Sequence, residues 1–152
     1  MGRQGEVVSA LTDDLKTLMA DAITMYFVAH GYHWNVEGQD FSQYHDLFAD
    51  IYEDVYSSID PIAENLRKLD EYAPFPLSKF TDLRTVESVE VKPEPQAMAK
   101  ALLKVNDGVL ETINKAFKSA EKAGEQGIMD FLAGRDDMHK KWRWQLTAST
   151  KS

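Results

Sequence analysis

The sequence predicts an all-α fold, a four-helix bundle in which a long crossover with its own short helix joins two helix pairs. Four segments carry apolar residues at steps of three and four, the period of an amphipathic helix. This pattern fails between residues 71 and 95, where four prolines stand. No alternation of apolar and polar residues longer than VESVEV indicates a strand.

The first predicted helix has an apolar stripe that leads to His33. Ser9 or Thr12 is a candidate cap for a turn near its start. Continuing the stripe by one turn places His33 on its buried edge. Asn35 and Gly38 then break the pattern. The stripe consists of Leu11, Leu15, Leu18, Ala22, Met25, Tyr26 and Ala29.

The second predicted helix begins near Asp40 or Ser42, both favourable residue types for an N-cap. His45 falls near its first turn. Pro61 lies inside this helix and removes one backbone hydrogen bond, so a bend and a tolerated kink are equally compatible with the sequence. The stripe consists of Phe48, Ile51, Tyr52, Val55, Ile59, Ile62, Leu66 and Leu69.

The crossover spans about residues 71–95, and its SKFTDL segment is long enough for a helix of one or two turns. The third helix is expected from about Gln96 to Ala123, with Gly124 as its stop. Gly108 in its middle predicts a close helix crossing. Its stripe consists of Met98, Leu102, Val105, Val109, Ile113, Ala116, Phe117 and Ala120.

The fourth helix is expected from Gln126 or Gly127 to Ala148. Its stripe consists of Phe131, Leu132, Met138, Trp142, Gln145 and Leu146. Two helix pairs joined by one long crossover have the connectivity of the ferritin-like four-helix bundle. We expect one domain over residues 1–152, with flexible ends at about 1–5 and 149–152.

Composition excludes several classes of protein. The chain has no cysteine, so a metal would have to bind through oxygen and imidazole ligands. No apolar run approaches the roughly 20 residues of a membrane span, and the start has no apolar signal core, so we expect a cytoplasmic protein. A net charge of -8 disfavours a general nucleic-acid binder. We interpret the basic residues near the C-terminal end as the cationic last turns of a helix; they are Arg135, Lys140, Lys141, Arg143 and Lys151.

Acidic residues and histidines gather in the stretch from His33 to Glu64. Ten acidic and two basic residues lie between Glu37 and Glu71, a balance of -8 that equals the net charge of the whole chain. His33 and His45 stand at the start of this stretch. Imidazoles and carboxylates at this density point to cation chemistry.

The spacing of these residues argues against a metal site inside one bundle. The chain lacks the Glu-x-x-His pattern of di-iron sites in bundle cores. Asp60 and Glu64 are one turn apart on one helix face. His45 stands fifteen residues before Asp60, roughly 22 Å along a helix, so the two cannot share an ion in one subunit. If His33, His45, Asp60 and Glu64 make one site, two subunits must contribute across a symmetric interface.

These residues resemble the signature of the Dps family of mini-ferritins. The resemblance is carried by the run Tyr32-His-Trp-Asn-Val-Glu-Gly38 and by Phe41, His45, Asp60, Ala63 and Glu64. It implies a ferroxidase site between two subunits, with His33 and His45 from one and Asp60 and Glu64 from the other. It further implies oxidation of Fe(II), preferably by hydrogen peroxide rather than dioxygen, storage of Fe(III) mineral in a twelve-subunit shell, and protection of DNA. Zn(2+) is a possible substitute for iron at such ligands.

The resemblance also suggests roles for residues around this site. It makes Trp34 an electron donor that quenches radicals, and the alternative is a packing aromatic. His30, one turn before His33, is a candidate hydrogen-bond partner of a ligand carboxylate or a partly buried histidine. Ala49 occupies the position, one turn after His45, where the family usually has an acid, so occupancy by one iron per site is an open alternative.

Further acids match other sites of the family. Asp46 and Asp50 correspond to residues that face the shell interior and seed the mineral, and Glu53 and Asp54 would extend that patch. The alternative is a solvated helix face. Asp130, more than Glu125, corresponds to the acidic pores on the threefold axes. His139 is expected to be structural.

Two other functions remain as alternatives. The first is a shell that binds and compacts DNA, for which family members commonly use basic terminal arms. Only Arg3 and Lys151 are available here in the two terminal segments, so direct DNA binding is disfavoured. The second is a metal-binding protein that holds zinc or iron without turnover.

Overall fold

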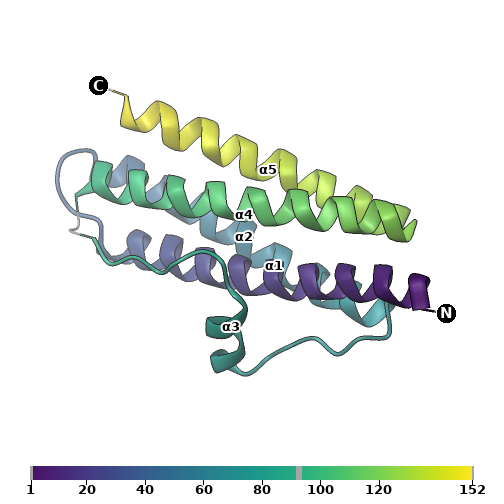
Figure 1. Cartoon of the computed structure of the whole chain (residues 1–152). Helices are drawn as coiled ribbons and strands as arrows, with labels where there is room; N and C mark the ends of the chain where they lie inside the picture. Colours follow the sequence, from purple (N-terminus) through teal and green to yellow (C-terminus); the bar gives the residue numbers. More distant parts are fainter. Residues whose placement is uncertain (1, 92–93, 152) are drawn as a thin grey trace.

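The computed structural model describes residues 2–91 and 94–151 as a bundle of four long helices with one short helix outside it (Figure 1). The long helices form two antiparallel pairs, and no strand occurs in the described ranges. The all-α prediction and its crossover are therefore confirmed. The helices are α1 (Gly2–Asn35), α2 (Phe41–Lys68), α3 (Leu77–Leu83), α4 (Pro95–Ala123) and α5 (Gln126–Thr150).

The apolar stripes of the four long helices meet in one core. Burying a Leu, Ile, Phe or Met side chain stabilises the fold by about 1.5–3 kcal/mol, so these positions determine which face of each helix turns inward. Two wholly or almost wholly buried residues from each long helix illustrate the core, namely Leu15, Met25, Phe48, Ile62, Leu102, Ile113, Leu132 and Leu146. None of the described helices is both long and apolar enough to cross a membrane.

The N-terminal helix is longer than the sequence suggests. It begins at Gly2, so the expectation that Ser9 or Thr12 caps its first turn is wrong. Thr12 donates its hydroxyl proton to the Ser9 carbonyl at 2.9 Å, a bond within the helix. Residues 2–5 and 149–150 are helical, whereas Met1 and Ser152 lie outside the described residues. Flexibility of the two ends stays a prediction.

The second helix follows the expected path. Asp40 stands at its N-cap with a left-handed backbone (φ 65°), although its side chain makes no capping hydrogen bond. The helix continues through Pro61 to Lys68, so α2 tolerates this proline. Gly124 ends α4 in the left-handed conformation (φ 70°), as its residue type predicts.

Gly108 marks a close approach, but to a different partner from the one expected. A Cβ atom added at Gly108 would lie 2.5 Å from Cγ1 of Val86, which belongs to the crossover. The prediction of a close helix crossing is therefore wrong, because the crossover passes over α4 at this point. Glycine permits this because it has no side chain to collide with Val86.

A buried carboxylate holds the crossover on the bundle. Asp21 of α1 is completely buried and accepts hydrogen bonds from the Thr85 and Val86 amides at 2.6 and 3.1 Å. The hydroxyls of Thr85 and Thr112 also donate to it, each at 2.7 Å. Four donors satisfy this buried carboxylate and tie the crossover to α1 and α4.

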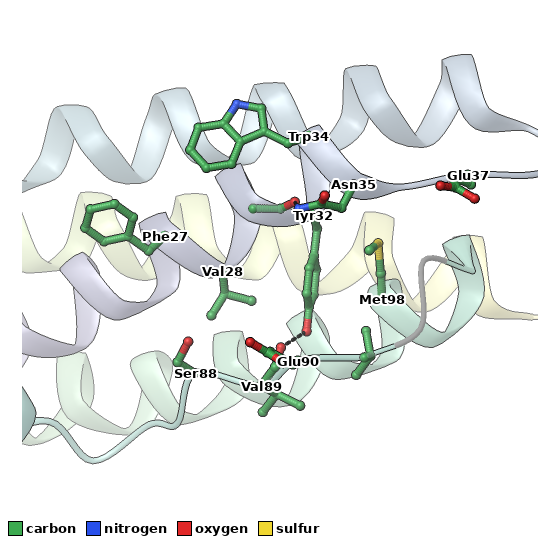
Figure 2. A pocket seen from close by; sticks show the side chains of 12 residues that line it. Phe27, Val28, Tyr32, Trp34, Asn35, Glu37, Ser88, Val89, Glu90 and Met98 are labelled. Carbon is green, nitrogen blue, oxygen red and sulfur yellow. Dashed lines mark hydrogen bonds between the residues drawn. The ribbon is translucent and has the colours of Figure 1, made fainter.

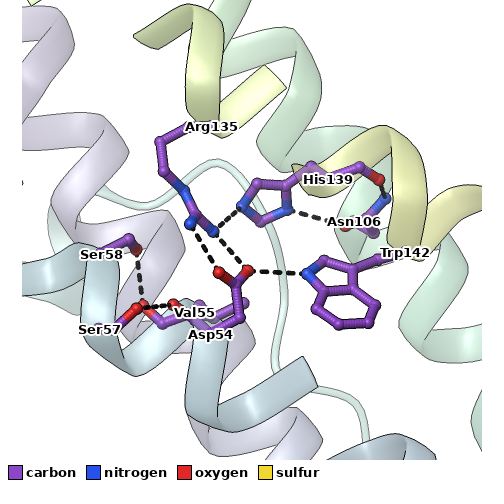
Figure 3. Close-up of polar contacts among 8 residues, drawn as sticks. All are labelled: Asp54, Val55, Ser57, Ser58, Asn106, Arg135, His139 and Trp142. Atoms are coloured by element: carbon purple, nitrogen blue, oxygen red, sulfur yellow. Dashed lines mark hydrogen bonds and ion pairs between the residues drawn. The ribbon is translucent and has the colours of Figure 1, made fainter. Parts of the chain in front are cut away.

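A buried ion pair joins α2 to α5 (Figure 3). Arg135 is only 8% exposed and donates two hydrogen bonds to the Asp54 carboxylate, at 2.9 and 2.8 Å. The Trp142 indole donates a third to Asp54, at 2.8 Å. Burial alone would raise the pKa of Asp54, but these hydrogen bonds and the Arg135 charge hold that pKa below its ordinary value.

Two expectations fail at this ion pair. Arg135 does not belong to a cationic last turn, since it lies inside α5 and the last turn of that helix contains no basic residue. Asp54 neither extends the patch of Asp46 and Asp50 nor belongs to a solvated helix face, because its carboxylate is bonded to Arg135 and Trp142. Neither the place of Arg135 nor the partner of Asp54 could be predicted from the local sequence, because the two residues stand far apart along the chain.

His139 is part of the same network and is structural, as expected. It is 1% exposed, and its Nδ1–H donates to the Asn106 side-chain oxygen at 2.8 Å. Its Nε2 accepts a hydrogen bond from Arg135 at 3.0 Å. This pattern requires a neutral imidazole. Burial, together with the Arg135 charge, lowers the pKa of His139 to about 3.

Candidate functional site

His33 and His45 lie face to face where α1 ends and α2 begins. Their ring centroids are 3.7 Å apart and their planes are inclined by 17°. The short connection between the helices brings them together, and it turns through Gly38 (φ 104°) and Asp40 (φ 65°). Glycine at residue 38 fits because other residues rarely adopt this backbone conformation.

The two imidazoles are held by reciprocal hydrogen bonds. His33 Nδ1 lies 2.7 Å from the His45 carbonyl oxygen, and His45 Nδ1 lies 2.7 Å from the His33 carbonyl oxygen. A carbonyl oxygen can only accept, so both Nδ1 atoms carry a proton and donate it. In the neutral rings the lone pair is then on Nε2, the atom through which such a histidine binds a metal.

Neither Nε2 atom has a partner among the residues that the structure describes. No hydrogen bond or ion pair joins the Nε2 of His33 or His45 to another residue of ranges 2–91 and 94–151. Both side chains are half-buried, so their orientation is set by packing while one edge remains accessible. The pair therefore presents two nitrogen atoms that are already oriented to bind a metal ion.

The carboxylates that the resemblance assigns to the site lie elsewhere on α2. Asp60 and Glu64 are exposed, one turn apart, and have no hydrogen-bond or ion-pair partner in the described part of the chain. Over the same residues, no group of three or more His, Asp or Glu side chains could hold a metal ion. One chain thus presents the two Nε2 atoms of His33 and His45 at one place and two carboxylates at another. Their meeting across two copies stays a prediction.

His30 lies beside the histidine pair and has a partner that we did not anticipate. Its Nδ1 is 2.9 Å from the Tyr26 hydroxyl. Its ring stacks on Tyr52, with centroids 3.8 Å apart and planes inclined by 8°. Burial, and then the neighbouring His33, lower the pKa of His30. The spacing of four residues between Tyr26 and His30 was the sequence signal for this contact. A bond from His30 to a ligand carboxylate stays a prediction.

Trp34 is 61% exposed and packs against His30, with ring centroids 4.1 Å apart. It adjoins a cleft of about 500 Å³ between the end of α1 and residues 88–91 of the crossover (Figure 2). Tyr32 closes one side of this cleft by donating its hydroxyl proton to the Val89 carbonyl at 2.7 Å. Trp34 therefore borders both His30 and solvent, and its role as an electron donor stays a prediction.

The remaining candidate acids are on exposed surfaces. Asp46 and Asp50 are exposed on α2, while Ala49 between them is half-buried. Asp130 is exposed near the start of α5. Roles in mineral nucleation and in a pore require an assembly and stay predictions.

Comparison with known proteins identifies the family of the chain. The family model described as a ferritin-like domain matches residues 12–150. A DNA protection during starvation protein of Helicobacter pylori is 28% identical over 135 residues, covering 88% of this chain and 94% of that protein. An uncharacterized low temperature-induced protein of Nostoc is 30% identical over 146 residues, covering 95% of this chain and 79% of that protein.

The chain belongs to the Dps family of ferritin-like proteins. Solved structures of Dps proteins share its fold. Dps from Thermosynechococcus elongatus superposes with a TM-score of 0.95 at 23% identity, covering 99% of this chain and 96% of that one. Dps from Vibrio cholerae, named as a member of a broad superfamily of ferritin-like diiron-carboxylate proteins, has a TM-score of 0.91 at 23% identity, with coverages of 96% and 92%. The resemblance inferred from the motif is confirmed.

Proposed function

We propose that this Dps-family chain oxidises Fe(II), preferably with hydrogen peroxide, at sites shared by two copies, and stores the Fe(III) product in a hollow shell. The observation that carries this proposal is the reciprocal hydrogen bonding of His33 and His45. It presents two Nε2 lone pairs without a partner in the described chain. A histidine pair that served packing alone would not need both rings held in the metal-binding tautomer.

A second copy supplies the rest of the site in this proposal. Asp60 and Glu64 are exposed on one face of α2, one turn apart, so their carboxylates are available to an ion held by another copy. Imidazole and carboxylate ligands with open positions suit Fe(II) and leave room for an oxidant. The two negative charges stabilise Fe(III) more than Fe(II), because the attraction grows with the charge of the ion.

An exposed aromatic surface around Tyr26 supports assembly in pairs. Phe27 and Tyr56 are 52% and 61% exposed, and both pack against Tyr26 in the same α1–α2 face. Large apolar side chains exposed together favour burial against another surface. We propose that twofold dimers form here and build a dodecamer. Asp46 and Asp50 would then seed the mineral inside, and Asp130 would line an entry pore.

The test is Fe(II) oxidation by an intact shell. Anaerobic loading with Fe(II), followed by hydrogen peroxide, is expected to give Fe(III) absorbance faster than a protein-free control. Asp60→Ala with Glu64→Ala should remove the acceleration and weaken Fe(II) binding, while native mass spectrometry shows the same assembly. The matched control is Asp107→Ala with Glu111→Ala, two exposed carboxylates at the same spacing on α4. An oxidation rate no faster than the protein-free control refutes ferroxidase activity and leaves metal binding without turnover.

We propose that DNA is protected by removal of iron and peroxide and not by direct binding, in a cytoplasmic setting. The net charge of -8 opposes contact with phosphates. No gel shift is expected even at low salt, and a shift that salt reverses would contradict this part of the proposal. Zn(2+) can occupy the same ligands but cannot be oxidised, so it should act as a competitive inhibitor of Fe(II) oxidation.

A further inference from the structure

The crossover begins with the most exposed apolar segment of the described chain. Tyr72, Phe75 and Leu77 are 81%, 83% and 75% exposed, and they stand close together in the sequence. A single apolar side chain on a surface needs no explanation, but several that are exposed together indicate a contact surface. This exposed apolar segment, residues 72–77, contributes nothing to the core of its own chain that would account for its composition.

The segment is held in a defined shape. Its two prolines, Pro74 and Pro76, restrict the backbone, and Pro76 is extended with φ −65° and ψ 135°. The Arg67 guanidinium lies over the Tyr72 ring, 4.7 Å from its centroid, and donates a hydrogen bond to the Glu71 carbonyl at 3.1 Å. A segment whose shape is already fixed loses little conformational entropy when it binds.

The cleft beside Trp34 is a complementary surface. Its volume is about 500 Å³, and its walls include Phe27, Trp34 and Val89, which are 52%, 61% and 37% exposed (Figure 2). Glu37 and Glu90 also line it, and no basic side chain does so in the part of the chain that the structure describes. Such a cleft suits aromatic side chains that are accompanied by a positive charge.

The exposed apolar segment starts level with the carboxylates of α2. His33 is level with His45, on which it stacks. Lys16 stands seventeen residues before His33, and Ile62 stands seventeen residues after His45, so Lys16 and Ile62 are level in these antiparallel helices. The Lys16 ammonium is 3.3 Å from the Glu71 carboxylate, so the chain has turned back to this level at residue 71. The segment thus starts beside one half of the proposed iron site, and the cleft starts beside the other.

A shared iron site brings the cleft and the segment together. In the proposed pairing, the histidines of one copy meet the carboxylates of the other, so the two α1–α2 faces run antiparallel across a twofold axis. An axis that crosses the helices within the interface keeps the crossover on the same side of both copies. The cleft and the exposed apolar segment both lie on the side of α1 that the crossover follows (Figure 1). The cleft of each copy therefore lies against the segment of the other.

We propose that the exposed apolar segment of each copy docks in the cleft of its twofold partner, with Phe75 as the anchor. This inference rests on the proposed function. Tyr72, at the carboxylate end of the segment, lies toward Trp34, and Phe75 lies toward Phe27 further along the cleft. The contact buries apolar surface of both copies and covers the exposed face of Trp34. The copy that supplies the carboxylates of an iron site thus also closes the cleft beside it.

Cross-linking of the iron-free protein tests this contact, because the chain has no cysteine of its own. Asn35→Cys with Tyr72→Cys, treated with a short bis-maleimide, should give a covalent dimer that contains a 35–72 link by mass spectrometry. One chain cannot form this link, since Asn35 is nineteen residues from Lys16, roughly 28 Å along α1. Each single variant is a control and should give no dimer. An assembled shell without the 35–72 link overturns the inference.

Dissociation of the shell on dilution is the second readout. Phe75→Asp should raise the concentration at which copies separate by about tenfold or more, because burial of an exposed phenylalanine is lost. Adding Glu90→Lys should recover part of this loss, since the new carboxylate then faces a cation in the cleft. Adding Glu87→Lys instead is the matched control, an exposed acid of the crossover outside the cleft, and should recover nothing. Wild-type dissociation in Phe75→Asp, or equal recovery by both lysines, overturns the inference.

Iron chemistry separates this inference from the proposed function. Asp60→Ala with Glu64→Ala should still form the 35–72 link, because the apolar contact needs no iron ligand. A 35–72 link in a shell that does not accelerate Fe(II) oxidation supports the docking and refutes the ferroxidase. Accelerated oxidation by a shell that forms no such link supports the ferroxidase and overturns the docking.

Discussion

Removal of the Asp54 carboxylate tests how α2, which carries His45, Asp60 and Glu64, is held on the bundle. In Asp54→Ala, the Arg135 guanidinium stays in a site where it is 8% exposed and loses both hydrogen bonds to its anion. Its remaining neighbour, His139, is neutral and cannot replace the lost charge. The Trp142 N–H also loses its acceptor.

The magnitude follows from these losses. Removing one partner of a buried ion pair costs about 3–5 kcal/mol, and an unsatisfied buried N–H adds to this. We expect Asp54→Ala to lower the free energy of unfolding by about 4 kcal/mol. The value stays within this range because the Asp54 side chain is 17% exposed and water can enter the space it leaves. For a chain of this size, that loss lowers the melting temperature by about 8–16 °C.

The assay is thermal unfolding followed by circular dichroism, at one protein concentration because assembly contributes to stability. Asp54→Ala with Arg135→Met should recover at least half of the loss, since it removes the unpaired charge as well. Lys140→Ala is the control. It breaks an ion pair to Asp136 on the same helix, but Lys140 is 51% exposed, so it should cost at most about 1 kcal/mol. A loss in Asp54→Ala as small as that of the control, or additive losses in the double variant, would refute the reasoning.

Three further predictions concern packing, pH and iron occupancy. Gly108→Ala should lower stability by about 1–3 kcal/mol because its Cβ would lie 2.5 Å from Val86, and Val86→Ala in the same chain should restore it in chemical denaturation. The pKa of His139 is depressed to about 3 in the folded protein, against 6.5 in the unfolded chain, so its contribution to the free energy of unfolding is complete above pH 6.5. This contribution is lost as the pH falls toward 3, by at most about 1.4 kcal/mol per pH unit. His139→Gln should flatten this pH dependence of stability, measured by denaturation from about pH 7 to 4. Ala49→Asp should raise Fe(II) bound per site from one toward two in anaerobic titration, and an unchanged ratio would contradict the role assigned to that position.

The histidine pair shows how far spacing leads and where it ends. The spacing of His33 and His45 across a short connection indicated that both belong near one helix junction, and the structure stacks them at 3.7 Å. Their exchange of hydrogen bonds with each other's carbonyls was not predictable, because it depends on where two backbone segments come to lie. The same holds for the stacking of His30 on Tyr52.

By itself the sequence determined the helices, the face that each turns inward, the crossover and the separation of the two histidines from Asp60 and Glu64 along the second helix. Each of these follows from residues close together along the chain, since a helix repeats every 3.6 residues and its length follows from its residue count. Only the tertiary structure decided the partners of Asp54, of Gly108 and of the two histidines. Asp54 and Arg135 are 81 residues apart in the sequence, and each by itself is a residue type expected on a solvated helix face. Their pairing depends on how α2 and α5 are rotated in the bundle, which no local pattern encodes.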